Sequence, residues 1–195
     1  MPEKKPIIIF TGPSGVGKGT IEKVLFAHKE LKLAFSISAT TRSPRVGEQH
    51  GVDYFFVDKN TFEQYLANNG VIEFSYHFNN YYGTLYSEIE RIHAQNHIPF
   101  LEIETIGARK ILDNPQNLEK YNIITFFVSP PSFADLEKRI INRNTETPEV
   151  MKIRLEKAKQ EMEEKIYFKY QIVNDVPERA AAEIREIILK EINNA

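Results

Sequence analysis

The chain has 195 residues, of which 42% are hydrophobic, so it is long and apolar enough to bury the core of one domain. Its 25 lysine and arginine residues nearly balance its 27 aspartate and glutamate residues, which argues against nucleic acid or an anionic membrane surface as a partner. The lack of cysteine excludes disulfides, thiol nucleophiles and cysteine-zinc sites and fits a cytoplasmic protein, and no apolar run approaches the ~20 residues that span a membrane.

Apolar runs rich in β-branched and aromatic residues alternate along the chain with segments of helical periodicity. The apolar runs predict strands at residues 7–10, 33–38, 98–104, 123–128 and 170–173. The periodic segments predict helices at residues 20–29, 87–95, 107–112, 132–141, 149–167 and 178–192. This alternation favours an α/β fold in which a parallel sheet is covered by helices on both faces.

Two polar stretches interrupt the alternation. Residues 40–80 are dense in arginine, tyrosine, phenylalanine and asparagine, and within them Asn60 and Glu63 fit the start of a helix and Gly70 fits its end. The second stretch, residues 139–150, is a basic turn between two predicted helices. Because no repeat or low-complexity linker separates these stretches from the rest, we interpret both as insertions in one domain.

The sequence GPSGVGKGT follows the first predicted strand and leads into the first predicted helix. Such a loop lets backbone N–H groups surround a phosphate, the helix adds its positive end, and Lys18 can reach the outer phosphates. The motif predicts a nucleotide site that comprises Gly12, Pro13, Ser14, Gly15, Val16, Gly17, Lys18, Gly19 and Thr20.

The position after the lysine is unusual, because the common motif has a hydroxyl there that binds magnesium, whereas this chain has Gly19 and a threonine one place later. Magnesium often keeps several water ligands, so a site can hold it mainly through nucleotide oxygens and water. We therefore expect Mg²⁺ to have at most one protein hydroxyl near it, that of Thr20. The GKGT ending resembles the nucleoside monophosphate kinases more than the regulatory GTPases.

The first polar stretch carries groups that could hold a second phosphate and a base. Two arginines and two tyrosines could clamp one phosphate group, through the paired donors of each guanidinium and the hydroxyl of each ring. These residues are Arg42, Arg45, Tyr54 and Tyr82. The Glu73 carboxylate could accept the N1–H and N2–H donors of guanine together, whereas adenine presents an acceptor at N1 and would leave the carboxylate unpaired.

The motifs TTRSPRVGEQHGVDYFFV, IEFSYHFNNYYGT, PPSFADLEKRI and IVND occur in this order, and with the glycine loop they resemble the guanylate kinase family along nearly the whole chain. The resemblance implies the fold of a P-loop nucleoside monophosphate kinase and transfer of the γ-phosphoryl group of ATP to GMP, with Mg²⁺ accompanying ATP. It implies small-molecule substrates, no nucleic acid or membrane partner, and a monomer or a small homo-oligomer.

The resemblance also implies roles for individual residues of this chain. It implies that Ser38, Glu73 and Thr84 bind the guanine base and that Glu102 also belongs to the GMP site. It implies that the two arginines and two tyrosines named above bind the GMP phosphate. On the ATP side the glycine loop is joined by Arg139 and by Asn174, which borders the adenine with Asp175. The implied catalytic residues are Lys18, Arg42, Arg143 and Arg154, of which Arg143, Arg154 and Arg139 belong to a lid.

The implied parts of the single domain are a core of residues 1–37, 88–138 and 156–195, a GMP-binding insertion of residues 38–87 and a lid of residues 139–155. The chain departs from the usual family pattern at Glu104 and Ile106, where aspartate and glutamine are common. Two alternatives stay open: a kinase of another nucleoside monophosphate, against which Glu73 argues, and a non-catalytic interaction module of the same fold, against which Lys18 and Arg143 argue.

Overall fold

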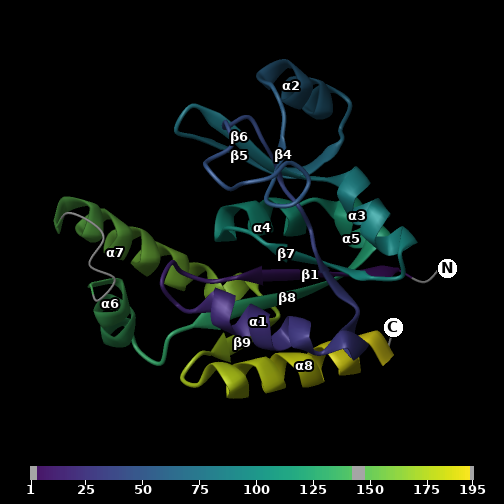
Figure 1. The fold of residues 1–195 in the computed structure, drawn as a ribbon. Helices are drawn as coiled ribbons and strands as arrows, with labels where there is room; N and C mark the ends of the chain where they lie inside the picture. The colour runs from purple at the N-terminus through teal and green to yellow at the C-terminus, as the bar shows by residue number, and fades with distance from the viewer. Residues whose placement is uncertain (1–3, 142–147, 194–195) are drawn as a thin grey trace.

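The fold of the chain is that of a computed structural model, which describes residues 4–141 and 148–193. At its centre lies a parallel sheet of five strands in the order β2-β7-β1-β8-β9 (Figure 1). These strands are β1 Lys5–Thr11, β2 Leu33–Phe35, β7 Ile98–Glu102, β8 Tyr121–Ser129 and β9 Tyr170–Val173. The predicted parallel sheet is confirmed, and its strands lie where the apolar runs predicted them.

Helices cover both faces of this sheet, as the alternation predicted (Figure 1). One face carries α1 Lys18–Ala27 and α8 Pro177–Asn193, with the short 3-10 turn η1 Lys29–Leu31 between α1 and β2. The other face carries α3 Tyr86–Ala94, α4 Thr105–Leu112 and α5 Pro115–Lys120. Because the five strands are parallel, their carboxyl ends all lie on the same side of the sheet. Binding sites in this kind of sheet form at that side.

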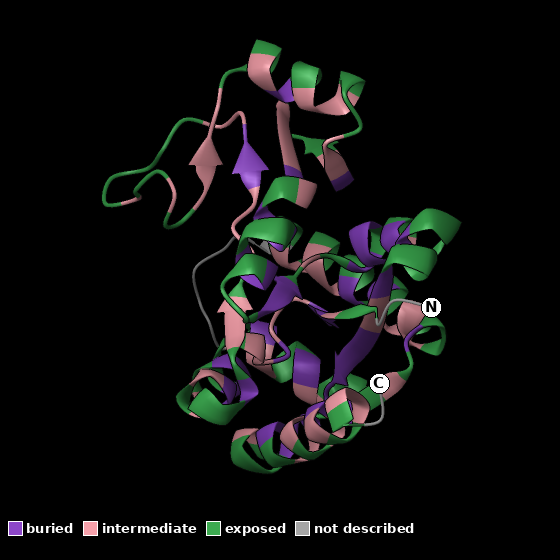
Figure 2. Cartoon of the chain, turned by 90° about the vertical axis from the view of Figure 1, so that its right-hand side faces the viewer, coloured by how far each residue is buried: buried purple, intermediate pink, exposed green. Residues whose placement is uncertain are grey.

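The two faces of the sheet bury two separate apolar clusters, and β1 contributes to both. Ile8 and Phe10 pack into the cluster on the α1 and α8 face, whereas Ile7 and Ile9 pack into the cluster on the opposite face. All four side chains are fully buried, and Figure 2 shows the central strands as the buried interior of the molecule. Burial on both faces explains why this strand reads as an uninterrupted apolar run.

The first polar stretch forms a second, smaller lobe above the central sheet (Figure 1). It contains a mixed sheet in the order β4-β3-β6-β5, made of β3 Ala39–Thr40, β4 Phe55–Phe56, β5 Val71–His77 and β6 Asn80–Leu85. The helix α2, Lys59–Ala67, packs on it through the buried Phe62. The sequence did not reveal this sheet, because β3 and β4 are two residues long and carry no periodicity.

The caps of α2 differ from the prediction. The helix begins two residues earlier than expected, because the side chain of Asp58, not that of Asn60, accepts a hydrogen bond from the Thr61 backbone N–H at 2.7 Å. At the other end Asn69, with φ of 51°, takes the left-handed conformation that we expected at Gly70. Asparagine is one of the few residues that adopt this conformation without a large cost.

The second polar stretch separates two helices that project to one side of the molecule (Figure 1). They are α6 Phe133–Ile141 and α7 Pro148–Glu163, and the 3-10 turn η2 Glu164–Tyr167 follows α7. The predicted lid residue Arg143 lies outside the described residues. In the described ranges 4–141 and 148–193, none of the helices is long and apolar enough to cross a membrane.

Candidate functional site

The glycine loop between β1 and α1 has a backbone that side chains would obstruct. Gly12 has φ of 153°, and a Cβ atom added to it would lie 2.4 Å from the Val128 carbonyl oxygen on the neighbouring strand. Gly17 has φ of 97°, and a Cβ atom there would lie 2.7 Å from Nδ2 of Asn174. Both positions therefore require glycine. The backbone of the loop turns as tightly as the glycine motif predicted.

Lys18, the first residue of α1, lies across the mouth of the loop. Its Nζ donates a hydrogen bond to the Gly12 carbonyl oxygen at 2.9 Å and lies 3.8 Å from Oε1 of Glu102, at the end of β7. The side chain is 17% exposed, so its charge faces the cavity in front of the loop and not bulk solvent. This is the position from which a lysine can reach a phosphate chain that follows the loop.

The outer side of the loop is held by two residues that the sequence assigned to ATP. The Val16 carbonyl oxygen accepts hydrogen bonds from Nδ2 of Asn174 at 2.8 Å and from Nη1 of Arg139 at 3.0 Å. Nη2 of Arg139 also donates to the Asn174 carbonyl oxygen at 3.1 Å. Together with Thr20 and Asp175 these residues line a cavity of about 430 Å³ beside the loop.

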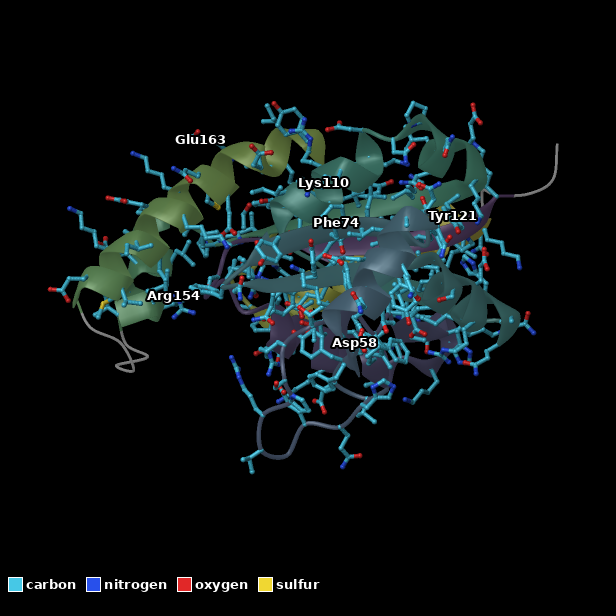
Figure 3. All side chains as sticks on the ribbon, turned by 90° about the horizontal axis from the view of Figure 1, so that it is seen from above. Asp58, Phe74, Lys110, Tyr121, Arg154 and Glu163 are labelled. Atoms are coloured by element: carbon cyan, nitrogen blue, oxygen red, sulfur yellow. The ribbon has the colours of Figure 1, made fainter. Side chains whose placement is uncertain are left out.

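A second cavity, of about 510 Å³, lies between the glycine loop, the end of β7 and α7. We call it the donor cavity. It is lined by Gly12, Ser14, Lys18, Glu102, Ile103, Glu104, Arg154, Lys157 and Glu161. The helix α7 reaches the loop here, since Nη2 of Arg154 lies 3.4 Å from the Ser14 hydroxyl, and Figure 3 shows Arg154 on α7. Lys157 links the same helix to Glu104 at 3.0 Å.

Two buried carboxylates border the loop, and the sequence analysis missed both. Glu22 is 8% exposed, and burial and the neighbouring Glu102 carboxylate raise its pKa to about 8, while Lys18 opposes the shift. Burial likewise raises the pKa of Glu161, against the opposing effect of Lys157 and the Ser14 amide. A Glu at the fifth position of a helix gives no signal in a single sequence, because most such residues lie on a solvated face.

A third cavity, of about 610 Å³, opens between the small sheet and α4, and we call it the acceptor cavity. It brings together most of the residues that the sequence assigned to GMP: Ser38, Arg45, Tyr54, Glu73, Tyr82 and Glu102. Residues 102–104 line the donor cavity as well, so this segment is a wall that the two cavities share. The helix α4 contributes Ile106, Gly107 and Lys110 to the lining, and the small sheet also contributes residues 74–78 and Gly83.

Glu73 is the buried carboxylate of the acceptor cavity, with 8% of the residue exposed. Its Oε1 accepts a hydrogen bond from the Thr84 hydroxyl at 2.8 Å. Burial raises the pKa of Glu73, and the hydrogen bonds from Thr84 and the charge of Lys110 oppose the increase. Thr84 itself does not line the cavity, so it acts on the cavity through the orientation of this carboxylate.

Arg42 does not point freely into the acceptor cavity, because Glu48 holds it. Nη1 and Nη2 of Arg42 donate to the two carboxylate oxygens of Glu48, each at 2.9 Å, and Oε2 of Glu48 also accepts the Arg45 backbone N–H at 2.7 Å. The guanidinium lies 5.4 Å from the centre of the Tyr54 ring. Glu48 thus orients the Arg42 guanidinium and binds the Arg45 backbone, and the sequence analysis gave it no role of its own although it lies within the motif TTRSPRVGEQHGVDYFFV.

Lys110 joins α4 to the edge of the small sheet (Figure 3). Its Nζ donates to the Phe74 carbonyl oxygen at 2.7 Å and lies 5.0 Å from the centre of the Phe74 ring. The contact fixes β5, and with it Glu73, relative to the first turns of α4. Sequence reasoning missed Lys110, since a lysine on a charged helix is most often a solvated residue.

In this parallel sheet the first strand ends in a glycine loop that is followed by a lysine, and a second cavity lies across a shared wall from the loop. These features define a P-loop nucleotide-binding α/β protein. The sequence model of the guanylate kinase family matches residues 3–191. The chain therefore belongs to the guanylate kinase family.

Relatives of known name agree with this assignment. The guanylate kinase of Mycoplasmopsis synoviae is 55% identical over 98% of each chain. The guanylate kinase of Bacillus subtilis is 40% identical, over 98% of this chain and 91% of that one. The crystal structure of a guanylate kinase from Anaplasma phagocytophilum superposes with a TM-score of 0.70 and 29% identity, covering 96% of this chain and 86% of that chain.

Proposed function

We propose that this chain transfers the γ-phosphoryl group of ATP to GMP, giving ADP and GDP. The observation that carries the proposal is the wall of residues 102–104, shared by a cavity with the lysine of a glycine loop and a cavity with a buried carboxylate. This arrangement would place a phosphate donor and a guanine-bearing acceptor on either side of one segment, so that their phosphates meet at its edge.

On the donor side we propose that the backbone of residues 12–20 and Lys18 hold the phosphates of ATP, with Arg139 and Asn174 on the side of the adenine. The chain's groups fit a hydrated Mg²⁺ ion, since Oε1 of Glu22 is a buried carboxylate oxygen without a hydrogen bond within the described part of the chain and lies with Glu102 near Lys18. Carboxylates accept hydrogen bonds from metal-bound water. The Thr20 hydroxyl that the sequence proposed for the ion lines the cavity beside the loop with Arg139, and the hydroxyl-bearing residue that lines the donor cavity is Ser14. Magnesium bound with ATP neutralises phosphate charge.

On the acceptor side we propose that Glu73, with Ser38 and Thr84, reads guanine. A carboxylate that accepts N1–H and N2–H together would be left unpaired by adenine, at a cost of at least ~1–3 kcal/mol for the buried group. The phosphate of GMP would bind Arg42, Arg45, Tyr54 and Tyr82. Glu102 would face the acceptor phosphate from the shared wall.

The chemistry needs no catalytic base, because a monophosphate offers an oxygen that is already ionised near neutral pH. Catalysis then rests on placing the two substrates in line and on neutralising the charge of the group in transit. We propose that Lys18, Arg42, Arg143 and Arg154 supply this positive charge, the last two from the lid. Exclusion of water by the lid would prevent loss of the phosphoryl group to hydrolysis.

We propose three functional parts of the domain: a core of residues 1–37, 88–138 and 156–195, a GMP-binding part of residues 38–87 and a lid of residues 139–155. The small sheet and α2 fall within the second part. For location we propose the cytoplasm, in line with the lack of cysteine, and for assembly a monomer or a small homo-oligomer.

The proposal is tested by measuring ADP formation with ATP and Mg²⁺ and each of GMP, AMP, CMP and UMP. We expect turnover with GMP and about ten-fold or more lower kcat/KM with AMP, since an unpaired buried group costs ~1–3 kcal/mol, a charged one more, and ~1.4 kcal/mol is a factor of ten. Equal use of AMP would overturn the proposed base selection. No ADP formation with any monophosphate, from a protein that binds GMP, would identify a non-catalytic module.

A further inference from the structure

Gly107 is the third residue of α4 and lies against the Glu73 carboxylate. A Cβ atom added to it would lie 2.7 Å from Oε2 of Glu73 and 3.4 Å from its Cδ. Real Cβ atoms do not approach an oxygen this closely, so any side chain here would displace the carboxylate. The three nearest heavy atoms to that added Cβ all belong to Glu73.

The backbone gives no reason for glycine at this position. Gly107 is buried within a helix and does not have the positive φ of Gly12 or Gly17, so alanine could adopt the same conformation. Glycine inside a helix is also unfavourable relative to alanine. The contrast with Gly83 is informative, since a Cβ there would lie 2.8 Å from the backbone oxygen of Glu73 and so would disturb the sheet itself.

The two oxygens of Glu73 therefore have different constraints. Oε1 is fixed by the Thr84 hydroxyl at 2.8 Å, whereas Oε2 occupies the space that the missing side chain of Gly107 leaves against α4. A carboxylate that pairs with two adjacent N–H groups must keep both oxygens in the plane of the base. A methyl group at residue 107 would turn or shift that plane while Thr84 still held the other oxygen.

We propose that Gly107 is a positioning residue for base selection: it holds open the space in which Glu73 presents both oxygens to the two N–H donors of guanine. This inference rests on the proposed function of Glu73. Gly107 lines the acceptor cavity, but the role proposed for it is to position Glu73, so the fold should tolerate alanine there while the recognition of guanine should not.

The test is Gly107→Ala, with affinities for GMP and IMP measured by calorimetry without ATP. IMP keeps N1–H but lacks the N2 amino group, so it needs only one carboxylate oxygen. We expect GMP affinity to fall about ten-fold and IMP affinity to fall less than about three-fold, because one hydrogen bond to a charged group is lost with GMP alone. ATP affinity should stay within about two-fold. The melting temperature should stay within a few degrees of the original, because the gain in helix propensity from alanine opposes the cost of displacing the buried carboxylate.

A double-mutant cycle shows whether the effect passes through Glu73. In a Glu73→Ala background no carboxylate meets the added methyl group, so Gly107→Ala should then change GMP affinity by less than about two-fold. Glu119→Ala, an exposed residue of α5 that lines neither the donor nor the acceptor cavity, is the control for GMP affinity. It should leave GMP affinity within about two-fold of the original value.

The outcomes separate the two proposals. If Glu73→Gln lowers the preference for GMP but Gly107→Ala leaves both GMP affinity and the preference over IMP unchanged, the role of Gly107 is wrong and that of Glu73 stands. If Gly107→Ala weakens GMP equally in the Glu73→Ala background, its effect does not pass through Glu73 and the inference is overturned. If Glu73→Gln itself leaves the preference unchanged, the proposed function of Glu73 fails, and the inference fails with it.

Discussion

The donor cavity and the acceptor cavity share a wall but are built by different means. Around the donor cavity, main-chain geometry sets the site: Gly12 passes close to the Val128 carbonyl, and the Val16 carbonyl is held from outside by Asn174. Around the acceptor cavity, pairs of side chains set the site. Thr84 orients Glu73, and Glu48 orients Arg42.

The two kinds of construction imply different responses to substitution. A site made of backbone has few side chains that carry its function, so loss of its one lysine should be severe. A site made of paired side chains distributes its function, so loss of a supporting partner should weaken one substrate by a limited factor. Substitutions in each cavity, and in the residues that support it, test this contrast.

Lys18→Met should lower kcat/KM by about 1,000-fold or more, because the lysine charge faces the donor phosphates and no neighbouring group replaces it. GMP affinity, measured by calorimetry without ATP, should stay within about two-fold. Lys23→Met, an exposed residue of the same helix, is the control and should have normal turnover. If GMP affinity collapsed with Lys18→Met, the division into donor and acceptor cavities would be wrong.

Arg154→Ala should lower kcat by about 10-fold to 100-fold while KM for each substrate changes by less than about three-fold. The reason is that a lid charge beside the loop stabilises the phosphoryl group most strongly while it is in transit. Steady-state kinetics with both substrates varied give this split. The control is Lys152→Ala, an exposed residue of α7. A rise in KM with normal kcat would contradict the proposed role of Arg154.

Glu48→Ala should raise KM for GMP by about five-fold to ten-fold with little change in KM for ATP. Glu48 holds the guanidinium of Arg42 through two hydrogen bonds, so its loss removes the preorganisation of a phosphate ligand, not the ligand itself. Glu63→Ala, an exposed residue of α2, is the matched control in the same lobe. Equal effects on ATP and GMP would show that the small lobe is not specific to the acceptor.

The smallest effect concerns pH. Burial raises the pKa of Glu73 above 4.5, so between that value and the raised pKa the folded chain keeps a proton that the unfolded chain releases. The free energy of unfolding from this group therefore falls as pH rises through the window. Guanine pairs with the ionised form of Glu73, so the affinity for GMP should rise a few-fold over the same pH window. GMP should then raise the melting temperature more at the upper end of the window than at the lower end.

Melting temperatures with and without GMP, from about pH 4 to pH 7, would reveal this trend. Subtracting the same series for Glu73→Gln removes the titration of the GMP phosphate, which both proteins share. A flat difference would mean that the Glu73 carboxyl does not titrate at the base site.

The sequence predicted most of the fold and the donor side because both are local patterns. The strand, glycine loop and helix are contiguous in the sequence, and the buried central strands are recognisable as apolar runs. The acceptor side was predicted as a set of residues but not as a structure. Its sheet contains strands of two residues, and the partners that orient the site, Glu48 and Gly107, act through space on Arg42 and Glu73. The roles of individual residues stay predictions.

The selection of guanine by Glu73 is the central claim, and the direct measurement is kcat/KM for GMP and for AMP in the original protein and in Glu73→Gln. Glutamine keeps the size of the side chain but offers one carbonyl acceptor and adds N–H donors, so GMP loses a charge-assisted pair while AMP can accept at N1. We predict that the preference for GMP narrows by about ten-fold or more, equivalent to ~1.4 kcal/mol, with ATP affinity unaffected. A preference that survives unchanged would contradict the account and would assign base selection to other groups.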